Sequence, residues 1–216
     1  PAIIETVSRI LGDDILVWAC EFIIKEAHTD KHISWHQDLT YWGMASDSQQ
    51  LTAWLALSEA SPESGCMRFL PGSHTAQVAH RDTFASDNIL SRGQEVAVEV
   101  DERHDVCAAL KPGQMSLHHG LMFHASGPNV TDDRRIGIAI RYITPTLKST
   151  RHSTDFAMLV AGANRCAHLI DVCGANTAFG PREMALYREV ADHQSTTFNA
   201  NAKEPLSYDR AATNGA

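Results

Sequence analysis

The sequence has little that would tie it to a membrane or to nucleic acid. Its apolar runs fall far short of the roughly 20 residues that a membrane-spanning helix needs. It has no cluster of lysine and arginine, and its formal net charge is −8, which disfavours binding to nucleic acid or to an anionic membrane. These absences leave a small molecule as the expected partner and say nothing of the oligomeric state.

Cysteine is also scarce. The five cysteines form an odd set without a C-x-x-C pair, so we expect reduced thiols rather than disulfides or a structural zinc site. No basic segment followed by an apolar one opens the chain as a signal peptide would. This cysteine usage therefore predicts a cytoplasmic protein.

Short apolar runs separated by Gly, Pro, Asp and Ser predict a mainly β protein. The runs that favour strands are 15–25, 51–57, 96–100, 114–117 and 136–143. Helical spacing, or a proline at the first turn, favours helices at 3–11, 154–162 and 182–194. Several short strands with irregular connections are typical of a double-sheet jelly roll.

We expect the 216 residues to form a single domain. The jelly-roll core would cover about 15–145, followed by a helical extension over about 150–195. The polar tail 195–216 is expected to be disordered or loosely docked. The connection 75–111 is long and polar, which is typical either of a functional lid or of a solvated excursion over the surface.

The triplet His36-Gln37-Asp38 is a candidate metal site. On an extended strand, side chains two positions apart project from the same face, so Gln37 would point away from the other two. A third, distant histidine would complete two histidines and one carboxylate, the facial set that leaves positions open on Fe(II). A core histidine beside an ordinary turn aspartate is the alternative. The candidates for the third ligand are His74, His118, His119 and His124.

The strand 135–142 alternates between isoleucine and other residues. We expect its isoleucines to pack into a core, while Arg135 shares the other face with Gly137 and Ala139 and so has open space beside it. A guanidinium is a planar fork of donors that binds a carboxylate through two hydrogen bonds. Arg134 has the opposite parity and is expected to be solvated.

Several motifs occur in an order that is informative as a set. The pieces are Trp35-His36-Gln37-Asp38, the run 51–57, Pro71-Gly72-Ser73-His74, His124-Ala125-Ser126-Gly127-Pro128-Asn129 and Arg134-Arg135. This ordered set, within residues 23–144, resembles the phytanoyl-CoA dioxygenase family of Fe(II)- and 2-oxoglutarate-dependent oxygenases. The resemblance implies a double-stranded β-helix, a cupin-like jelly roll, with flanking helices. Because relatives carry a helical region before the triplet and this chain begins at Pro1, we expect an N-terminal segment to be missing.

The resemblance also assigns roles to residues. It implies that His36, Asp38 and His124 bind Fe(II), since His124 opens the segment that matches the distal-ligand motif of the family. Arg135 lies at the family's spacing beyond His124 and is implied to bind the distal carboxylate of 2-oxoglutarate.

Further contacts follow from the same matches. Trp54, Ser126 and Lys25 correspond to positions that contact 2-oxoglutarate in relatives, although a packed core tryptophan and a solvated lysine at a strand end are equally compatible with the sequence. The candidates for contact with the primary substrate are His118, Tyr41 and Trp42.

The implied activity is that of a dioxygenase that consumes 2-oxoglutarate and O₂, hydroxylates a small polar metabolite and releases succinate and CO₂. Hydroxylation is expected rather than halogenation, because halogenating relatives have a small residue where this chain has Asp38. One alternative is a cupin-type isomerase or lyase that uses the same ligands without 2-oxoglutarate. The other is a jelly-roll module that binds without catalysis.

Overall fold

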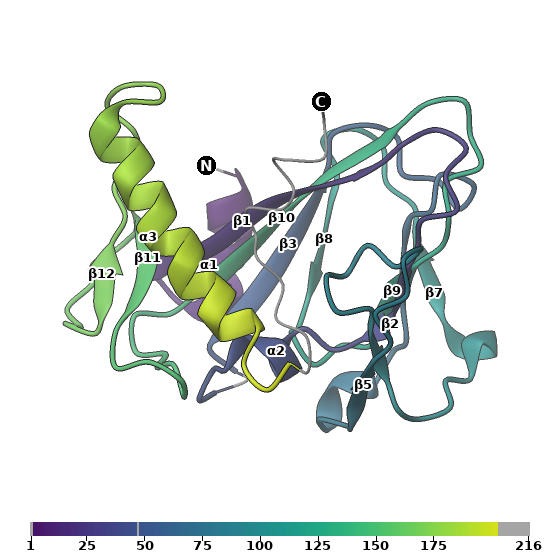
Figure 1. Cartoon of the computed structure of the whole chain (residues 1–216), viewed down its shortest axis with the longest axis horizontal. Coiled ribbons are helices and arrows are strands. Elements are labelled where there is room, and N and C mark those ends of the chain that lie inside the picture. The colour runs from purple at the N-terminus through teal and green to yellow at the C-terminus, as the bar shows by residue number, and fades with distance from the viewer. Residues whose placement is uncertain (1, 47, 203–216) are drawn as a thin grey trace.

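Two facing β-sheets form the centre of the protein, whose computed structural model describes residues 2–46 and 48–202 (Figure 1). The larger sheet has six strands in the order β12-β11-β1-β10-β3-β8. In chain order they are β1 (Ile15–Lys25), β3 (Gln50–Ala56), β8 (Met115–His118), β10 (Arg135–Ile143), β11 (Asp155–Ala161) and β12 (Leu169–Asp171). The mainly β jelly roll with flanking helices is thereby confirmed.

The smaller sheet has the order β2-β9-β4-β7 and supplies the opposite wall of the interior. Its strands are β2 (Ile33–His36), β4 (Met67–Phe69), β7 (Val106–Ala108) and β9 (His124–Ser126). A separate hairpin pairs β5 (His80–Asp82) with β6 (Gln94–Val96). Short 3₁₀ helices occur at Ser73–Thr75 and Glu102–His104.

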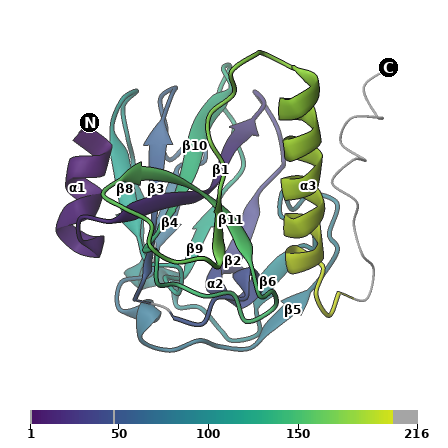
Figure 2. The same cartoon turned by 90° about the vertical axis from the view of Figure 1, so that its left-hand side faces the viewer.

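Helices lie on opposite sides of the larger sheet, as Figure 2 shows for α1 (Ala2–Leu11) and α3 (Pro181–Phe198). Val7 of α1 packs with Leu51 and Tyr142 on the outer face of the sheet. The amphipathic pattern that predicted this helix therefore buries its apolar side as expected.

The inner face of the larger sheet is covered at one end by the short helix α2 (Leu39–Trp42) and by the end of α3. The Trp18 ring lies 5.5 Å from the Trp42 ring and 6.0 Å from the Phe198 ring, measured between centroids. A second apolar cluster, which contains Trp54 and Met67, joins the two sheets elsewhere. Between these clusters lies the cavity described below.

The predicted helix over 154–162 is wrong. This segment is strand β11, which pairs with β1 in the register Ile15↔Ala161 and Val17↔Met158. Seven residues with a mostly apolar pattern suit a short strand as well as a helix, and here the free edge of β1 decides between them. The predicted helical extension is therefore partly sheet.

The predicted start of the polar tail, at residue 195, is too early. Helix α3 continues to Phe198, and Thr197 and Phe198 are buried. The stretch 199–202 follows the helix, and the rest of the predicted tail, 203–216, lies outside the described residues.

The connection 75–111 is neither a free lid nor a simple surface excursion. It contains β5, β6 and β7, and its residues Ile89 to Ser91 line the central cavity. The predicted strand 96–100 is correspondingly displaced, because pairing with β5 ends β6 at Val96. The polar residues of this connection lie mostly on its outer surface. Their abundance in the sequence is the reason why the strands within the connection were not predicted.

Two further expectations concern the cysteines and membrane-spanning helices. The five cysteines, all within the described residues, are free thiols. Among the described helices, none combines the length and apolar character that crossing a bilayer requires.

Candidate metal centre

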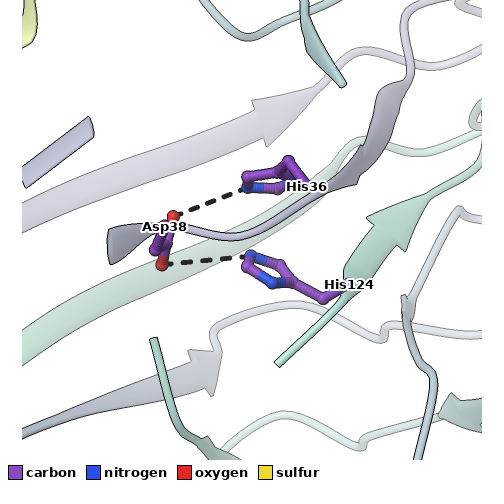
Figure 3. Close-up of side chains that lie close together, drawn as sticks. All are labelled: His36, Asp38 and His124. Atoms are coloured by element: carbon purple, nitrogen blue, oxygen red, sulfur yellow. Dashed lines mark ion pairs between the residues drawn. The ribbon is translucent and has the colours of Figure 1, made fainter. Parts of the chain in front are cut away.

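His36, Asp38 and His124 meet at the edge of the smaller sheet (Figure 3). His36 ends β2 and His124 begins β9, and the pairing of these strands places the two residues opposite each other. Asp38 does not lie on the strand as expected. It has helical backbone angles, φ −60° and ψ −46°, and precedes α2. The convergence of His36 and Asp38 thus comes from a strand-to-helix turn rather than from strand alternation.

The three side chains offer ligand atoms that all lie within 4.8 Å of one another. His36 Nε2 lies 3.5 Å from Asp38 Oδ1, and His124 Nε2 lies 3.9 Å from Asp38 Oδ2. The Asp38 side chain is only 12% exposed. Two imidazoles and one carboxylate around one point are suited to a divalent transition metal with open positions.

Backbone carbonyls fix the orientation of both imidazoles. His36 Nδ1 lies 2.9 Å from Ser34 O, and His124 Nδ1 lies 2.8 Å from Met122 O. A carbonyl oxygen only accepts, so each Nδ1 is the donor and each neutral ring keeps its lone pair on Nε2. Both lone-pair atoms are the ones that face Asp38, which is the arrangement of metal-binding histidines.

Burial and neighbouring charges set the protonation states of this group. Burial, followed by the nearby His36, lowers the pKa of His124 well below its ordinary value. Burial alone would raise the pKa of Asp38, but the neighbouring imidazoles of His118, His124 and His36 hold it well below its usual range. A neutral imidazole and an ionised carboxylate are the forms that bind a metal.

The other candidate histidines lie differently. His118 is buried and lines the same cavity, with Nε2 at 3.9 Å from Asp38 Oδ2, but it is outside the three-residue group. His74 is exposed and packs against His119, with ring centroids 5.7 Å apart. The geometry therefore favours His124 over His74 and His119, and it places His118 beside the site.

His36, Asp38 and His124, together called the metal cluster below, border a cavity of about 480 Å³. The walls of this cavity come from both sheets, α2 and the end of α3. Arg135 enters this cavity from β10 and is 1% exposed. Its guanidinium carbon lies 5.1 Å from the centroid of the Trp54 ring. Within the described part of the chain, Arg135 Nε and Nη2 have no hydrogen-bond partner. A buried guanidinium in this state is costly and fits an anionic ligand.

The predicted alternation of β10 holds, with two corrections. Arg135, Gly137 and Ala139 are buried and face inward, whereas Ile136, Ile138 and Ile140 are only half-buried. Of these three isoleucines, Ile140 joins the core beneath α1. The space beside Gly137 is not open either, because the Trp54 ring occupies it. Arg134 is exposed and pairs with Glu26 at 2.9 Å, as its parity predicted.

Lys25 is not a solvated strand end. It is 1% exposed, and its ammonium donates to Ser126 Oγ at 2.5 Å and to the carbonyls of Ser126 and Gly127. Burial, followed by the charge of Arg135, lowers the pKa of Lys25 to about 7. Ser126 itself lines the cavity. Any influence of Lys25 on a ligand therefore passes through Ser126.

Tyr41 and Trp42 also line the cavity, as expected. The structure adds Glu21, Thr52 and Arg141, which the motifs did not single out. Phe198, which closes the cavity from α3, is a further addition. The signal for Arg141 was present in the sequence, because it shares the inward parity of Arg135 on β10.

Comparisons with known proteins agree with this geometry. The sequence profile described as phytanoyl-CoA dioxygenase (PhyH) matches residues 1–137. Phytanoyl-CoA dioxygenase domain-containing protein 1 of Rattus norvegicus is 32% identical over 139 residues, which are 61% of this chain and 46% of that protein. The chain spans about half the length of the curated relatives it matches.

Solved structures extend the likeness further along the chain. The non-heme monooxygenase ThoJ in its apo form is 33% identical with a TM-score of 0.82, over 93% of this chain and 73% of that one. Its nickel complex gives 30% identity and a TM-score of 0.77, over 93% and 72% of the two chains. EvdO2 of Micromonospora carbonacea var. aurantiaca, complexed with 2-oxoglutarate, is 30% identical over 60% of this chain and 54% of that one, with a TM-score of 0.51.

Proposed function

This chain belongs to the phytanoyl-CoA dioxygenase (PhyH) family, and we propose that it is an Fe(II)- and 2-oxoglutarate-dependent dioxygenase that hydroxylates a small, polar metabolite. The observation that carries this proposal is Arg135. A fully buried guanidinium that faces the metal cluster without an anionic partner among the described residues calls for a ligand with a carboxylate.

The residues of the metal cluster fit Fe(II) in type and orientation. His36 and His124 present Nε2 lone pairs, and Asp38 is ionised. Iron held there would supply the activation of dioxygen, which no side chain can provide. The likeness to ThoJ, which has a nickel complex, supports the proposal that this chain binds a metal.

The cosubstrate site would extend from the metal cluster towards Arg135. The Trp54 ring supports the guanidinium plane. Ser126 lines this path from β9, and its hydroxyl accepts from Lys25 Nζ and donates to the Gly65 carbonyl at 2.7 Å. The 2-oxoglutarate complex of EvdO2 supports this choice of keto acid. A carboxylate on Arg135 would gain two charge-assisted hydrogen bonds and remove the cost of the uncompensated cation.

The reaction outcome follows from the carboxylate ligand. Asp38 would fill the coordination position that a halide needs, so the product is expected to carry a hydroxyl group rather than a halogen. Measuring product mass under ¹⁸O₂ in chloride-rich buffer tests this. A chlorinated product would contradict the role of Asp38.

The proposed activity is tested by two linked measurements on protein loaded anaerobically with Fe(II). O₂ uptake and succinate release are followed on admission of air, with and without 2-oxoglutarate and with a panel of small polar metabolites. We expect both signals to require the keto acid, to disappear in Asp38→Ala and to persist in His74→Ala. Turnover that does not need the keto acid would favour an isomerase or lyase. Protein that binds no transition metal would favour a binding module.

A further inference from the structure

The cavity has a charged residue at each end of the same strand. Arg135 and Arg141 project inward from β10 and both line the cavity. Six residues of strand separate their Cα atoms by about 20 Å, at roughly 3.3 Å per residue. Gly137 and Ala139 lie between them, so no long side chain of β10 divides the space. Both guanidinium groups therefore line the same cavity, and the Trp54 ring lies beside Gly137 on the stretch of β10 between them. The parts of the cavity next to Arg135 and Arg141 are called its two ends below.

The end at Arg141 differs in its chemistry from the end at Arg135. Arg141 Nη1 lies 3.0 Å from Glu21 Oε1, and Nη2 donates to Glu21 Oε2 at 3.1 Å. The guanidinium lies over the Trp42 ring, 5.0 Å from its centroid. The Arg141 side chain is 11% exposed and that of Glu21 is 40% exposed. A cation and an anion therefore stand side by side on the wall of the cavity.

A polar group without a hydrogen-bond partner lies next to this pair. Thr52 is directly opposite Arg141 in the register of β3 and β10 and opposite His118 in that of β3 and β8. It is 1% exposed and lines the cavity. Among the described residues, its hydroxyl oxygen has no hydrogen-bond partner. A buried hydroxyl in this position can serve a ligand group bound by Arg141.

This end also lies close to the metal cluster. Thr52 pairs with His118 across β3 and β8, and His118 Nε2 lies 3.9 Å from Asp38 Oδ2. Asp38 and Arg141 line the same cavity. A molecule held by Arg141 would therefore lie within reach of the proposed oxidation site. It would approach from the end opposite to Arg135.

We propose that Arg141, Glu21 and Thr52 form the recognition site for the primary substrate, and that this substrate is a zwitterion of the amino-acid type whose anionic group binds Arg141. Its cationic group binds Glu21, the more exposed partner of the pair. A ligand of both signs replaces one ion pair by two complementary contacts, whereas a purely anionic or cationic ligand would leave one partner uncompensated. This inference rests on the proposed function for the reaction that the bound substrate would undergo. The binding of the substrate does not depend on the proposed function.

The test measures binding to Fe(II)-loaded protein with 2-oxoglutarate under anaerobic conditions. The probes are the standard free L-amino acids, each compared with its carboxamide and with its N-acetyl derivative. Tryptophan fluorescence, to which Trp42 beneath Arg141 contributes, reports binding, and calorimetry gives the affinities. At least one free amino acid should bind about tenfold or more tightly than either derivative, because each derivative removes one charged contact.

Variants assign the two contacts separately. Arg141→Ala should weaken the preferred amino acid at least tenfold and abolish its advantage over the carboxamide, and Arg141→Lys should restore part of it. Glu21→Gln should abolish only the advantage over the N-acetyl form. Arg134→Ala is the matched control, because it removes an exposed ion pair, Arg134 with Glu26, that lies just before β10 and outside the cavity. The control should bind within about twofold of the wild type.

The same proteins are titrated with 2-oxoglutarate, which separates this inference from the proposed function. Unchanged 2-oxoglutarate affinity in Arg141→Ala, together with lost amino-acid binding, supports the inference. It is overturned if no amino acid outperforms its derivatives or if Arg141→Ala binds the preferred one as tightly as the wild type. Protein that binds the amino acid through Arg141 but never binds 2-oxoglutarate would contradict only the proposed dioxygenase.

Discussion

Each end of the cavity contains an arginine, and the two arginines differ in whether a carboxylate of the protein neutralises the guanidinium charge. Arg135 is buried against Trp54 and lacks a carboxylate among the described residues, whereas Arg141 is paired with Glu21 over Trp42. An uncompensated buried cation destabilises the protein until an anion binds, so it favours an obligatory cosubstrate. A compensated, partly exposed pair can exchange partners at lower cost. The difference indicates that burial, and not residue type, decides which ligand each arginine receives.

Both arginines share their cavity with the three proposed metal ligands, and removing one of these ligands has the largest expected effect. Replacing His36, Asp38 or His124 by Ala should abolish stoichiometric Fe(II) binding, since each supplies one corner of a three-point site. His74→Ala, which changes an exposed histidine, should retain the metal. Metal analysis after desalting measures both. If His124→Ala still binds stoichiometric iron, the third ligand must be another histidine, and His118 is the nearest candidate.

Removing Arg135 tests the uncompensated end directly. Leaving a buried carboxylate without its partner costs on the order of 3 to 5 kcal/mol, which is more than about a hundredfold in affinity at roughly 1.4 kcal/mol per decade. Arg135→Ala should therefore weaken 2-oxoglutarate binding by that factor in calorimetric titrations and leave Fe(II) binding intact. Arg134→Ala, its exposed neighbour, should have almost no effect. Equal losses in the two variants would refute the assignment by strand parity.

Gly137 provides a way to disturb one end without removing a charge. A methyl group at this position would collide with the Trp54 ring. Gly137→Ala should destabilise the fold by about 1 to 3 kcal/mol and weaken 2-oxoglutarate binding by displacing the ring that supports Arg135. Gly174→Ala is the control, because a methyl group there meets nothing within 4 Å. If Gly137→Ala binds 2-oxoglutarate as tightly as the control, the Trp54 ring does not position Arg135.

Lys25 gives the end at Arg135 a pH dependence. Its pKa is lowered from 10.5 to about 7 in the folded protein, so between these values the unfolded chain binds the additional proton. Stability should therefore rise with pH across this window, and the full cost of burying the charge should be present below pH 7. For one group the slope is at most about 1.4 kcal/mol per pH unit.

The measurement compares unfolding free energies of the wild type and Lys25→Met from pH 6 to pH 9.5. The wild type should gain stability relative to the variant as the pH rises. Lys31→Met, which changes an exposed lysine, should run parallel to the wild type. Parallel curves for Lys25→Met as well would show that the ammonium keeps its proton in the folded state, held by Ser126 and Gly127.

Local sequence patterns were sufficient for the long strands of the larger sheet and for the first helix, but they did not single out the short strands of the smaller sheet. The strands at 15–25, 51–57 and 136–143 and the first helix lie where their periodicities predicted them. These segments have long, regular patterns, in which side-chain alternation and burial agree. The segment 154–162 was mistaken for a helix because its short apolar run has no decisive period, and only the edge of β1 made it a strand.

Part of the candidate site could also be predicted from the sequence. The family's ordered motifs pointed to His36, Asp38, His124 and Arg135, and the structure brings the first three together and directs Arg135 into the same cavity. The reason given for Asp38 was incorrect, since a turn into α2 and not strand alternation turns it towards the histidines. The parity argument that selected Arg135 applied equally to Arg141, which nevertheless went unnoticed because no motif included it.

By itself, the sequence determined the chemical types present, the alternation of β10 and the family to which the chain belongs. Only the tertiary structure decided which groups are buried, which are compensated and which face one another. Lys25 and Arg135 became buried cations because β1 and β10 pair at Lys25↔Arg135 under the smaller sheet, and Phe198 reached the cavity because α3 packs on Trp18. Burial and long-range pairing depend on residues far apart in the chain, and no local pattern encodes them.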